Sequence, residues 1–231
     1  MTITTSARGS LLWQPHALGW WIAILFAIGS FLFALGVVPA YASAVGPPAD
    51  ASTFFLGSIF FTAAGYLQFV QSINAPGEAG PGRTRLLAWQ PSRIDFWACG
   101  VQSIGTLLFN VSTFAATLTA LDPAQEHRLI WRPDLSGSIA FMIASSLAWL
   151  EVNHRWFAVT PRGLPWWIVA MNLAGSVAFM VSAVAGYISP STGEIANLPV
   201  ANLGTFVGAV GFFVGAVLLL PQVRAQAATP S

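Results

Sequence analysis

The chain has 231 residues, of which 55% are hydrophobic and only 7% are charged, and its net charge at pH 7 is +1. Soluble domains carry roughly 25% charged residues, so this composition excludes a soluble globular domain, and the weak charge excludes an electrostatic nucleic-acid binder. There is no lysine and one cysteine, Cys99, which excludes a lysine Schiff base, a phosphate-loop lysine, an intrachain disulfide and a multi-cysteine metal site.

Six apolar stretches are long enough to cross a bilayer, which takes about 20 residues. In chain order they cover residues 17–42, 53–73, 94–120, 135–158, 164–188 and 198–220. Inside hydrocarbon every backbone N–H and C=O group must be paired, so each stretch is predicted to be a helix. The first stretch exceeds the apolar core of a signal peptide, about 7–15 residues, and we expect it to be retained.

The arginines indicate how these helices are oriented. Seven of the nine lie beside the start of an odd-numbered stretch or the end of an even-numbered one: Arg8, Arg83, Arg85, Arg93, Arg155, Arg162 and Arg224. The other two, Arg128 and Arg132, lie between the third and fourth stretches. The positive-inside rule therefore places both termini in the cytoplasm. Six tryptophans agree with an interfacial belt on that side: Trp20, Trp21, Trp97, Trp156, Trp166 and Trp167.

A threefold internal repeat runs through the odd-numbered stretches. Six residues after a proline comes a tryptophan, eight residues further a glycine with a small hydroxyl residue, and then a phenylalanine. These positions are Pro15, Trp21, Gly29 and Phe33; Pro91, Trp97, Gly105 and Phe109; and Pro161, Trp167, Gly175 and Phe179. No gap is needed in any copy, so chance is a poor explanation.

The even-numbered stretches carry a second pattern. A glycine is followed four residues later by phenylalanine and fourteen residues later by an amide or a carboxylate. The three sets are Gly57, Phe61 and Gln71; Gly137, Phe141 and Glu151; and Gly208, Phe212 and Gln222. The prediction is an all-α, polytopic membrane bundle of six transmembrane helices, formed by three tandem helical hairpins in parallel orientation about a pseudo-axis along the membrane normal.

This pattern also predicts the domain organisation. The whole chain, 1–231, is one membrane domain with internal repeats at 13–73, 89–155 and 159–224 and short polar tails at 1–12 and 225–231. Small residues let membrane helices approach closely, so we expect the repeated small residues to be helix-packing positions rather than catalytic ones. They are Gly29, Ser30, Gly57, Ser58, Gly105, Thr106, Gly137, Ser138, Gly175, Ser176 and Gly208.

Two segments begin with Gly-Ser and end with Phe, at residues 29–33 and 57–61, and looser matches occur at 137–141 and 175–179. With its tryptophan-led first helix, this hairpin resembles the YrhK-like family of small bacterial membrane proteins. The family unit is a single hairpin, so the resemblance implies that this chain is a triplicated version. It implies no activity and no catalytic residue.

Polar residues inside membrane spans are the natural candidates for a site. The repeat places Gln71, Glu151 and Gln222 at one position and Gln102 and Asn172 at another, all at a similar depth near the cytoplasmic side. His154 follows Glu151 at a spacing that would put both on one helix face. The predicted polar cluster is therefore Glu151, His154, Gln71, Gln222, Gln102 and Asn172.

Two interpretations of Glu151 stay open. It pairs with His154, Arg155 or a neighbouring arginine and fixes a helix end, or it titrates in a polar cavity that gates a solute or proton. A di-iron site would need a second Glu-x-x-His pair and more carboxylates, and a bis-histidine haem would need His16 and His154 to face each other. We expect no metal, no cofactor and no catalytic residue.

These observations favour a non-enzymatic structural or partner-binding bundle. A small transporter or channel that uses a cytoplasmic-side polar cavity around Glu151 is the main alternative, and a membrane enzyme is a weaker one. The expected partners are the lipid bilayer and either a second copy of the chain or another membrane protein.

Overall fold

The structure is a computed structural model that describes residues 13–75, 84–157, 160–161 and 163–227. This part of the chain is helical, and the one extended feature in it is an isolated bridge between Ile188 and Ile195. The six long helices are α1 (Leu18–Gly36), α3 (Pro47–Ile73), α4 (Ile94–Ala115), α6 (Arg132–Asn153), α7 (Leu164–Ala185) and α8 (Leu198–Ala227). Three short elements are α2 (Pro39–Val45), α5 (Pro123–Glu126) and a π-helical turn, η1 (His127–Trp131).

Five segments of the described chain are long and apolar enough to cross a membrane. They are Leu18–Gly36, Pro47–Ile73, Pro123–Asn153, Leu164–Ala185 and Leu198–Val223. The prediction of multiple apolar membrane-type helices is confirmed for these five. The remaining predicted stretch forms α4, a helix of 22 residues that is not among these five segments.

Prolines explain why several predicted boundaries are wrong. The first stretch was expected to run to residue 42, but α1 ends at Gly36 and α2 begins at Pro39. A proline lacks the N–H group that would continue the first helix, and it favours the first turn of a new one. The same preference starts α3 at Pro47, earlier than the predicted residue 53. In contrast, α8 continues through Pro221 beyond the predicted end at residue 220.

The fourth stretch also differs from its prediction at both ends. It was expected at 135–158, but α5, η1 and α6 follow one another from Pro123 to Asn153. Asp122 begins this run with a capping box, in which its side chain accepts from the Gln125 backbone N–H at 2.8 Å. At the other end His154 adopts a left-handed conformation with φ of 53°, which stops the helix.

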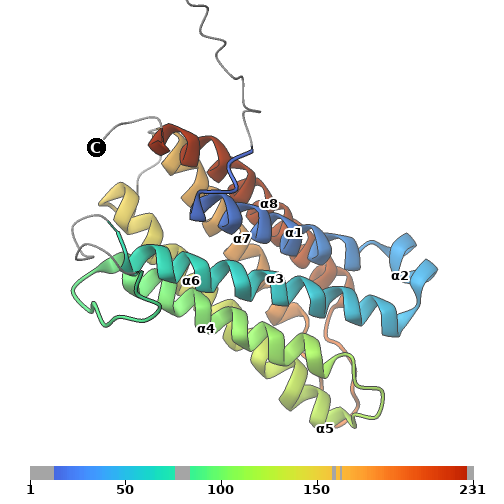
Figure 1. The fold of residues 1–231 in the computed structure, drawn as a ribbon. Helices are drawn as coiled ribbons and strands as arrows, with labels where there is room; N and C mark the ends of the chain where they lie inside the picture. The colour runs from blue at the N-terminus through green and yellow to red at the C-terminus, as the bar shows by residue number, and fades with distance from the viewer. Residues whose placement is uncertain (1–12, 76–83, 158–159, 162, 228–231) are drawn as a thin grey trace, which may run out of the picture.

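The six long helices form a closed ring. Each packs against the next one in the order α1, α3, α4, α6, α7 and α8, and α8 packs against α1. Figure 1 shows the start of α1 and the end of α8 at one end of the bundle, which we call the terminal end. It shows α2 and α5 at the opposite end, which we call the distal end.

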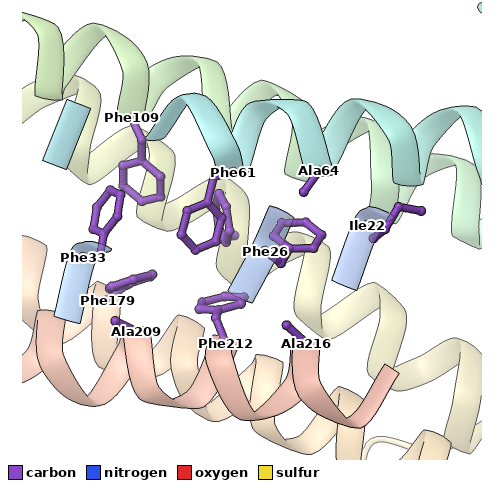
Figure 2. Packing of buried hydrophobic residues seen from close by; sticks show 11 residues of the cluster. Ile22, Phe26, Phe33, Phe61, Ala64, Phe109, Phe179, Ala209, Phe212 and Ala216 are labelled. Carbon is purple, nitrogen blue, oxygen red and sulfur yellow. The ribbon is translucent and has the colours of Figure 1, made fainter. Parts of the chain in front are cut away.

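Six buried phenylalanines fill the centre of this ring (Figure 2). Phe33, Phe109 and Phe179 form one triangle, with ring centroids 6.0–6.4 Å apart. Phe61, Phe141 and Phe212 form a second triangle, at 5.4–6.2 Å. The two triangles are joined by the pairs Phe33–Phe61, Phe109–Phe141 and Phe179–Phe212, at 5.1–5.5 Å. We call this group the phenylalanine prism.

Glycines bring the helices close enough for the prism to form. A Cβ atom added to Gly29 would lie 2.8 Å from Cδ2 of Phe61, and one added to Gly57 would lie 2.8 Å from Cδ2 of Phe33. The same reciprocal contact joins α4 with α6 and α7 with α8. The eleven small residues expected at helix contacts are all buried.

Buried hydroxyl and amide groups join several pairs of neighbouring helices, among them α3 with α4 and α6 with α7. Between α3 and α4, Ser58 donates to Oδ1 of Asn110 at 2.5 Å, and Nδ2 of Asn110 donates to Thr62 at 2.7 Å. Between α6 and α7, the hydroxyl groups of Ser145 and Ser176 share a hydrogen bond of 2.7 Å. Ser30 on α1 is fully buried, and its hydroxyl has no hydrogen-bond partner within the described chain.

This difference gives a first prediction, tested on a matched pair of serines. Ser30→Ala removes an unsatisfied buried hydroxyl, so we expect the free energy of unfolding to stay constant or to rise slightly. Ser176→Ala leaves Ser145 with a lost partner and should cost about 0.6–1.7 kcal/mol, the range found for such bonds between membrane helices. Unfolding in mixed micelles of increasing dodecyl sulfate content measures both, and equal losses in the two variants would contradict the assignment.

Candidate functional site

A cavity of about 540 Å³ opens between α1, α3 and α8. Its residues belong to the last turns of α3 and α8 and to the first turns of α1, so it lies at the terminal end. The lining residues are Gly19, Ile22, Gln68, Gln71, Asn74, Ala75, Leu219, Gln222 and Val223. Two positions of the predicted polar cluster, Gln71 and Gln222, are therefore brought to one cavity.

A smaller hollow of about 30 Å³ adjoins this cavity on its inner side and shares Gln68 and Leu219 with it. It has room for about two water molecules. Its lining residues are Phe26, Gln68, Gln102, Ile168, Asn172, Phe212, Ala216 and Leu219. Two more predicted residues, Gln102 and Asn172, meet here with Phe26, their equivalent in the first repeat. We call the two hollows together the amide cavity.

The phenylalanine prism closes the inner end of the amide cavity. Phe212 lines the inner hollow and belongs to the prism, and Phe26 lines it and contacts Phe61 with ring centroids 5.6 Å apart. Phe212 is 4% exposed and Phe61 is 2% exposed. The cavity is therefore a blind one that ends at the middle of the bundle.

The amides differ in how far the protein satisfies them. Asn74 is saturated, because Nδ2 donates to the Val70 and Arg85 carbonyls and Oδ1 accepts from the Arg85 N–H. Oε1 of Gln68 is buried and has no partner in the described chain. The unsatisfied hydrogen-bonding capacity therefore lies at the inner end, where Gln68 lines both hollows.

Glu151 and His154 lie outside the amide cavity, in contrast to the other four members of the predicted cluster. Glu151 is half-buried near the end of α6, within electrostatic reach of Arg93 and Asp95. Arg93 and Asp95 form an ion pair at the start of α4. The amide cavity is therefore built around glutamines and asparagines rather than around the one carboxylate.

His154 does not share a helix face with Glu151 as the spacing suggested. The helix ends at Asn153, and the left-handed conformation of His154 turns the chain away from the helical path. Its side chain is exposed, and no hydrogen bond or ion pair joins it to Glu151 in the described structure. Within the same residues no group of three His, Cys, Asp or Glu side chains is placed to hold a metal ion.

The π-helical turn η1 at the distal end is held by hydrogen bonds and aromatic contacts. His127 bonds through Nδ1 to the Ile188 carbonyl at 2.7 Å, and Trp131 donates from Nε1 to the Ala183 carbonyl at 2.9 Å. The Trp131 ring lies 4.7 Å from His127 and 4.9 Å from Tyr187, centroid to centroid. These side chains tie the π-helical turn to the connection between α7 and α8.

Sequence reasoning missed Gln68, which lines both hollows. The repeat could not reveal it, because the equivalent positions are Ala148 and Leu219. A second signal was present, since Gln68 and Gln71 are three residues apart and therefore share a face of α3. A cavity residue that occurs in only one copy of the repeat can be found from its helical spacing to other polar residues, but not by comparing the copies.

Comparison with known proteins leaves the site to be interpreted from its own geometry. No family model, no curated protein and no solved structure matches the chain.

Proposed function

We propose that this chain is a six-span integral membrane protein of three tandem hairpins that acts as a non-enzymatic structural or partner-binding bundle. Its membrane would be the bacterial cytoplasmic membrane, with both termini in the cytoplasm. The observation that carries the proposal is the phenylalanine prism, because it fills the centre of a closed ring of helices and leaves no aqueous path through it.

The outward face of α4 supports a sixth span. Ile104, Leu107, Val111 and Phe114 are 48–57% exposed and recur every three or four residues, so they form one apolar stripe on the surface. The polar residues Thr106 and Ser112 are buried on the opposite side. At 22 residues α4 is about 33 Å long, which matches the hydrocarbon thickness of about 30 Å.

The contacts within helix pairs support the repeat. Glycine and phenylalanine meet reciprocally in α1 with α3, in α4 with α6 and in α7 with α8. Each pair contributes one phenylalanine to each triangle of the prism, as an approximate threefold axis requires. The resemblance of these hairpins to the YrhK-like family stays a prediction.

Topology labelling tests the proposed spans and their orientation. In a Cys99→Ser background, single cysteines replace Leu87 and Phe157 at the terminal end and Ala120 and Ser191 at the distal end; all four sites are exposed. In whole bacterial cells an impermeant maleimide should label the Ala120→Cys and Ser191→Cys variants, and the other two only after permeabilisation. Labelling of Leu87→Cys and Ala120→Cys from the same side would mean that α4 does not cross.

A small transporter is the second candidate, and the amide cavity favours it because the cavity extends from the terminal end to the middle of the bundle. In proteoliposomes we expect no solute or proton flux above that of empty vesicles while the prism is intact. Because Glu151 lies outside the cavity, any flux that does occur should be unchanged by Glu151→Gln. Flux that disappears in Glu151→Gln would restore the interpretation of Glu151 as a gate. Metal and haem analysis of the purified protein tests the enzyme alternative.

A further inference from the structure

The amide cavity is lined by side chains of one chemical kind. Its carboxamides come from four helices and one helix cap: Gln68 and Gln71 on α3, Asn74 directly after α3, Gln102 on α4, Asn172 on α7 and Gln222 on α8. No described residue that lines it carries a charge. A carboxamide offers two N–H donors and one carbonyl acceptor, so a wall of amides suits a ligand that both donates and accepts hydrogen bonds.

The inner end of the cavity has hydrogen-bonding groups to spare. Oε1 of Gln68 is buried without a partner, and the amides of Gln102 and Asn172 form no hydrogen bond within the described chain. A buried polar group that is left unsatisfied costs free energy, and native proteins satisfy nearly all such groups with protein, water or ligand. The buried, unsatisfied oxygen of Gln68, with the half-buried amides of Gln102 and Asn172 beside the same hollow, therefore favours occupation from outside the chain.

The backbone of α8 is shaped to make room for one of these amides. A Cβ atom added to Gly215 would lie only 2.5 Å from Oδ1 of Asn172. Any residue larger than glycine would therefore displace the carboxamide from its present place beside the inner hollow. Gly215 holds no position in the repeat pattern, so its contact with Asn172 is particular to this helix pair.

From this geometry we infer that the amide cavity binds a small uncharged solute of the amide or polyol class. Such a solute would place its polar end against Gln68, Gln102 and Asn172 and the rest of its structure in the outer hollow of about 540 Å³. A charged solute is less well matched, because no described lining residue supplies a counter-charge to offset its lost hydration. The inference deepens the proposed function by giving the bundle a ligand.

Acetamide, acetate and methylammonium form a suitable set of probes, because they are similar in size and differ in charge. Saturation-transfer NMR on the full-length protein in detergent micelles measures each, with glycerol as the polyol probe. We expect saturable binding of acetamide and glycerol, and binding at least about tenfold weaker for the two ions. Equal binding of acetate, or saturation by none of the probes, would overturn the inference; in the latter case the cavity holds water only.

Two variants place the binding at the inner hollow by different means. Asn172→Leu replaces the carboxamide by an apolar side chain of similar size. Gly215→Ala keeps the Asn172 carboxamide but displaces it. Each should weaken acetamide binding about tenfold, the effect of one lost hydrogen bond. Asn202→Leu on α8 is the matched control, since Asn202 is a half-buried amide outside the cavity. The Asn202→Leu variant should bind acetamide as tightly as the parent protein does.

Failure of this inference can be separated from failure of the proposed function. Binding measured in micelles does not depend on the orientation of the chain in the membrane or on its number of spans. The maleimide labelling tests these two properties independently. If Asn172→Leu does not fold, Gln68→Met tests the same hollow, because it removes a buried acceptor that the protein leaves unsatisfied. Unchanged acetamide binding in folded Gly215→Ala and Gln68→Met would overturn the assignment of the site.

Discussion

Gly204→Ala in α8 should lower the free energy of unfolding by about 1–3 kcal/mol, although alanine favours a helix over glycine by about 1 kcal/mol. The added Cβ would lie 2.8 Å from the Ala178 carbonyl oxygen and 2.9 Å from the Ser182 backbone nitrogen. Both atoms belong to the backbone of α7, so no side chain can move aside. The two helices must separate, and this loosens the packing of each against the other.

The glycines of α8 make this contact extensive. Gly204, Gly208, Gly211 and Gly215 recur every three or four residues, and each faces a residue of α7 within 3.0 Å of its added Cβ. Small residues at this spacing let membrane helices approach closely, and packing rather than the hydrophobic effect then holds them together in lipid. Gly204→Ala therefore affects the contact along much of its length.

Gly100→Ala is the matched control for this experiment. Gly100 also lies within a long helix, but the nearest atom to its added Cβ is a ring carbon of Phe69 at 3.8 Å, an ordinary contact. Alanine there should be neutral or stabilise the helix by up to about 1 kcal/mol. Both variants can be compared by unfolding in mixed micelles. A Gly204→Ala protein as stable as the parent would show that α7 and α8 pack less closely than described.

Phe61→Ala is expected to have the largest effect on stability, a loss of about 3–5 kcal/mol. Phe61 contacts the rings of Phe26, Phe33, Phe141 and Phe212, so it joins the two triangles of the prism and the inner end of the amide cavity. Its removal would leave a void in the buried core of the bundle. The midpoint of unfolding in mixed micelles and the thermal melting temperature both measure the loss.

Two controls separate the prism from the general effect of losing a ring. Phe61→Leu keeps much of the volume and should recover a large part of the lost stability. Phe31→Ala removes a ring on the outer face of α1, where the side chain is 56% exposed, and should change stability by about 0.5 kcal/mol or less. Equal losses in Phe31→Ala and Phe61→Ala would mean that the prism does not hold the ring of helices together.

The existence and the order of the long helices could be predicted because each is indicated by a long run of apolar residues. Such a run is recognised without knowing which helices it packs against, and the phenylalanines of the repeat could be aligned without that knowledge. The helix ends could not be predicted in the same way. Pro39 and Pro47 start new helices while Pro221 lies within one, and this choice depends on packing around each proline.

The candidate site was only partly predictable for a related reason. Gln71, Gln222, Gln102 and Asn172 were found because the repeat places them at one depth, but depth does not determine which side chains face each other. Glu151 satisfied the same rule and lies elsewhere. Gln68 and Gly215 belong to the site through contacts between helices far apart in the sequence, which no local pattern records.

The contact between α1 and α8 has a consequence for how the protein is made. Four long helices lie between α1 and α8 in the sequence, so the contact that closes the ring cannot form until α8 has been synthesised. The outer hollow lies where α1, α3 and α8 meet, so the five preceding long helices can be synthesised before this hollow has its third wall. We therefore expect a nascent chain arrested before α8 to form an open ring that lacks both the α1–α8 contact and the complete outer hollow.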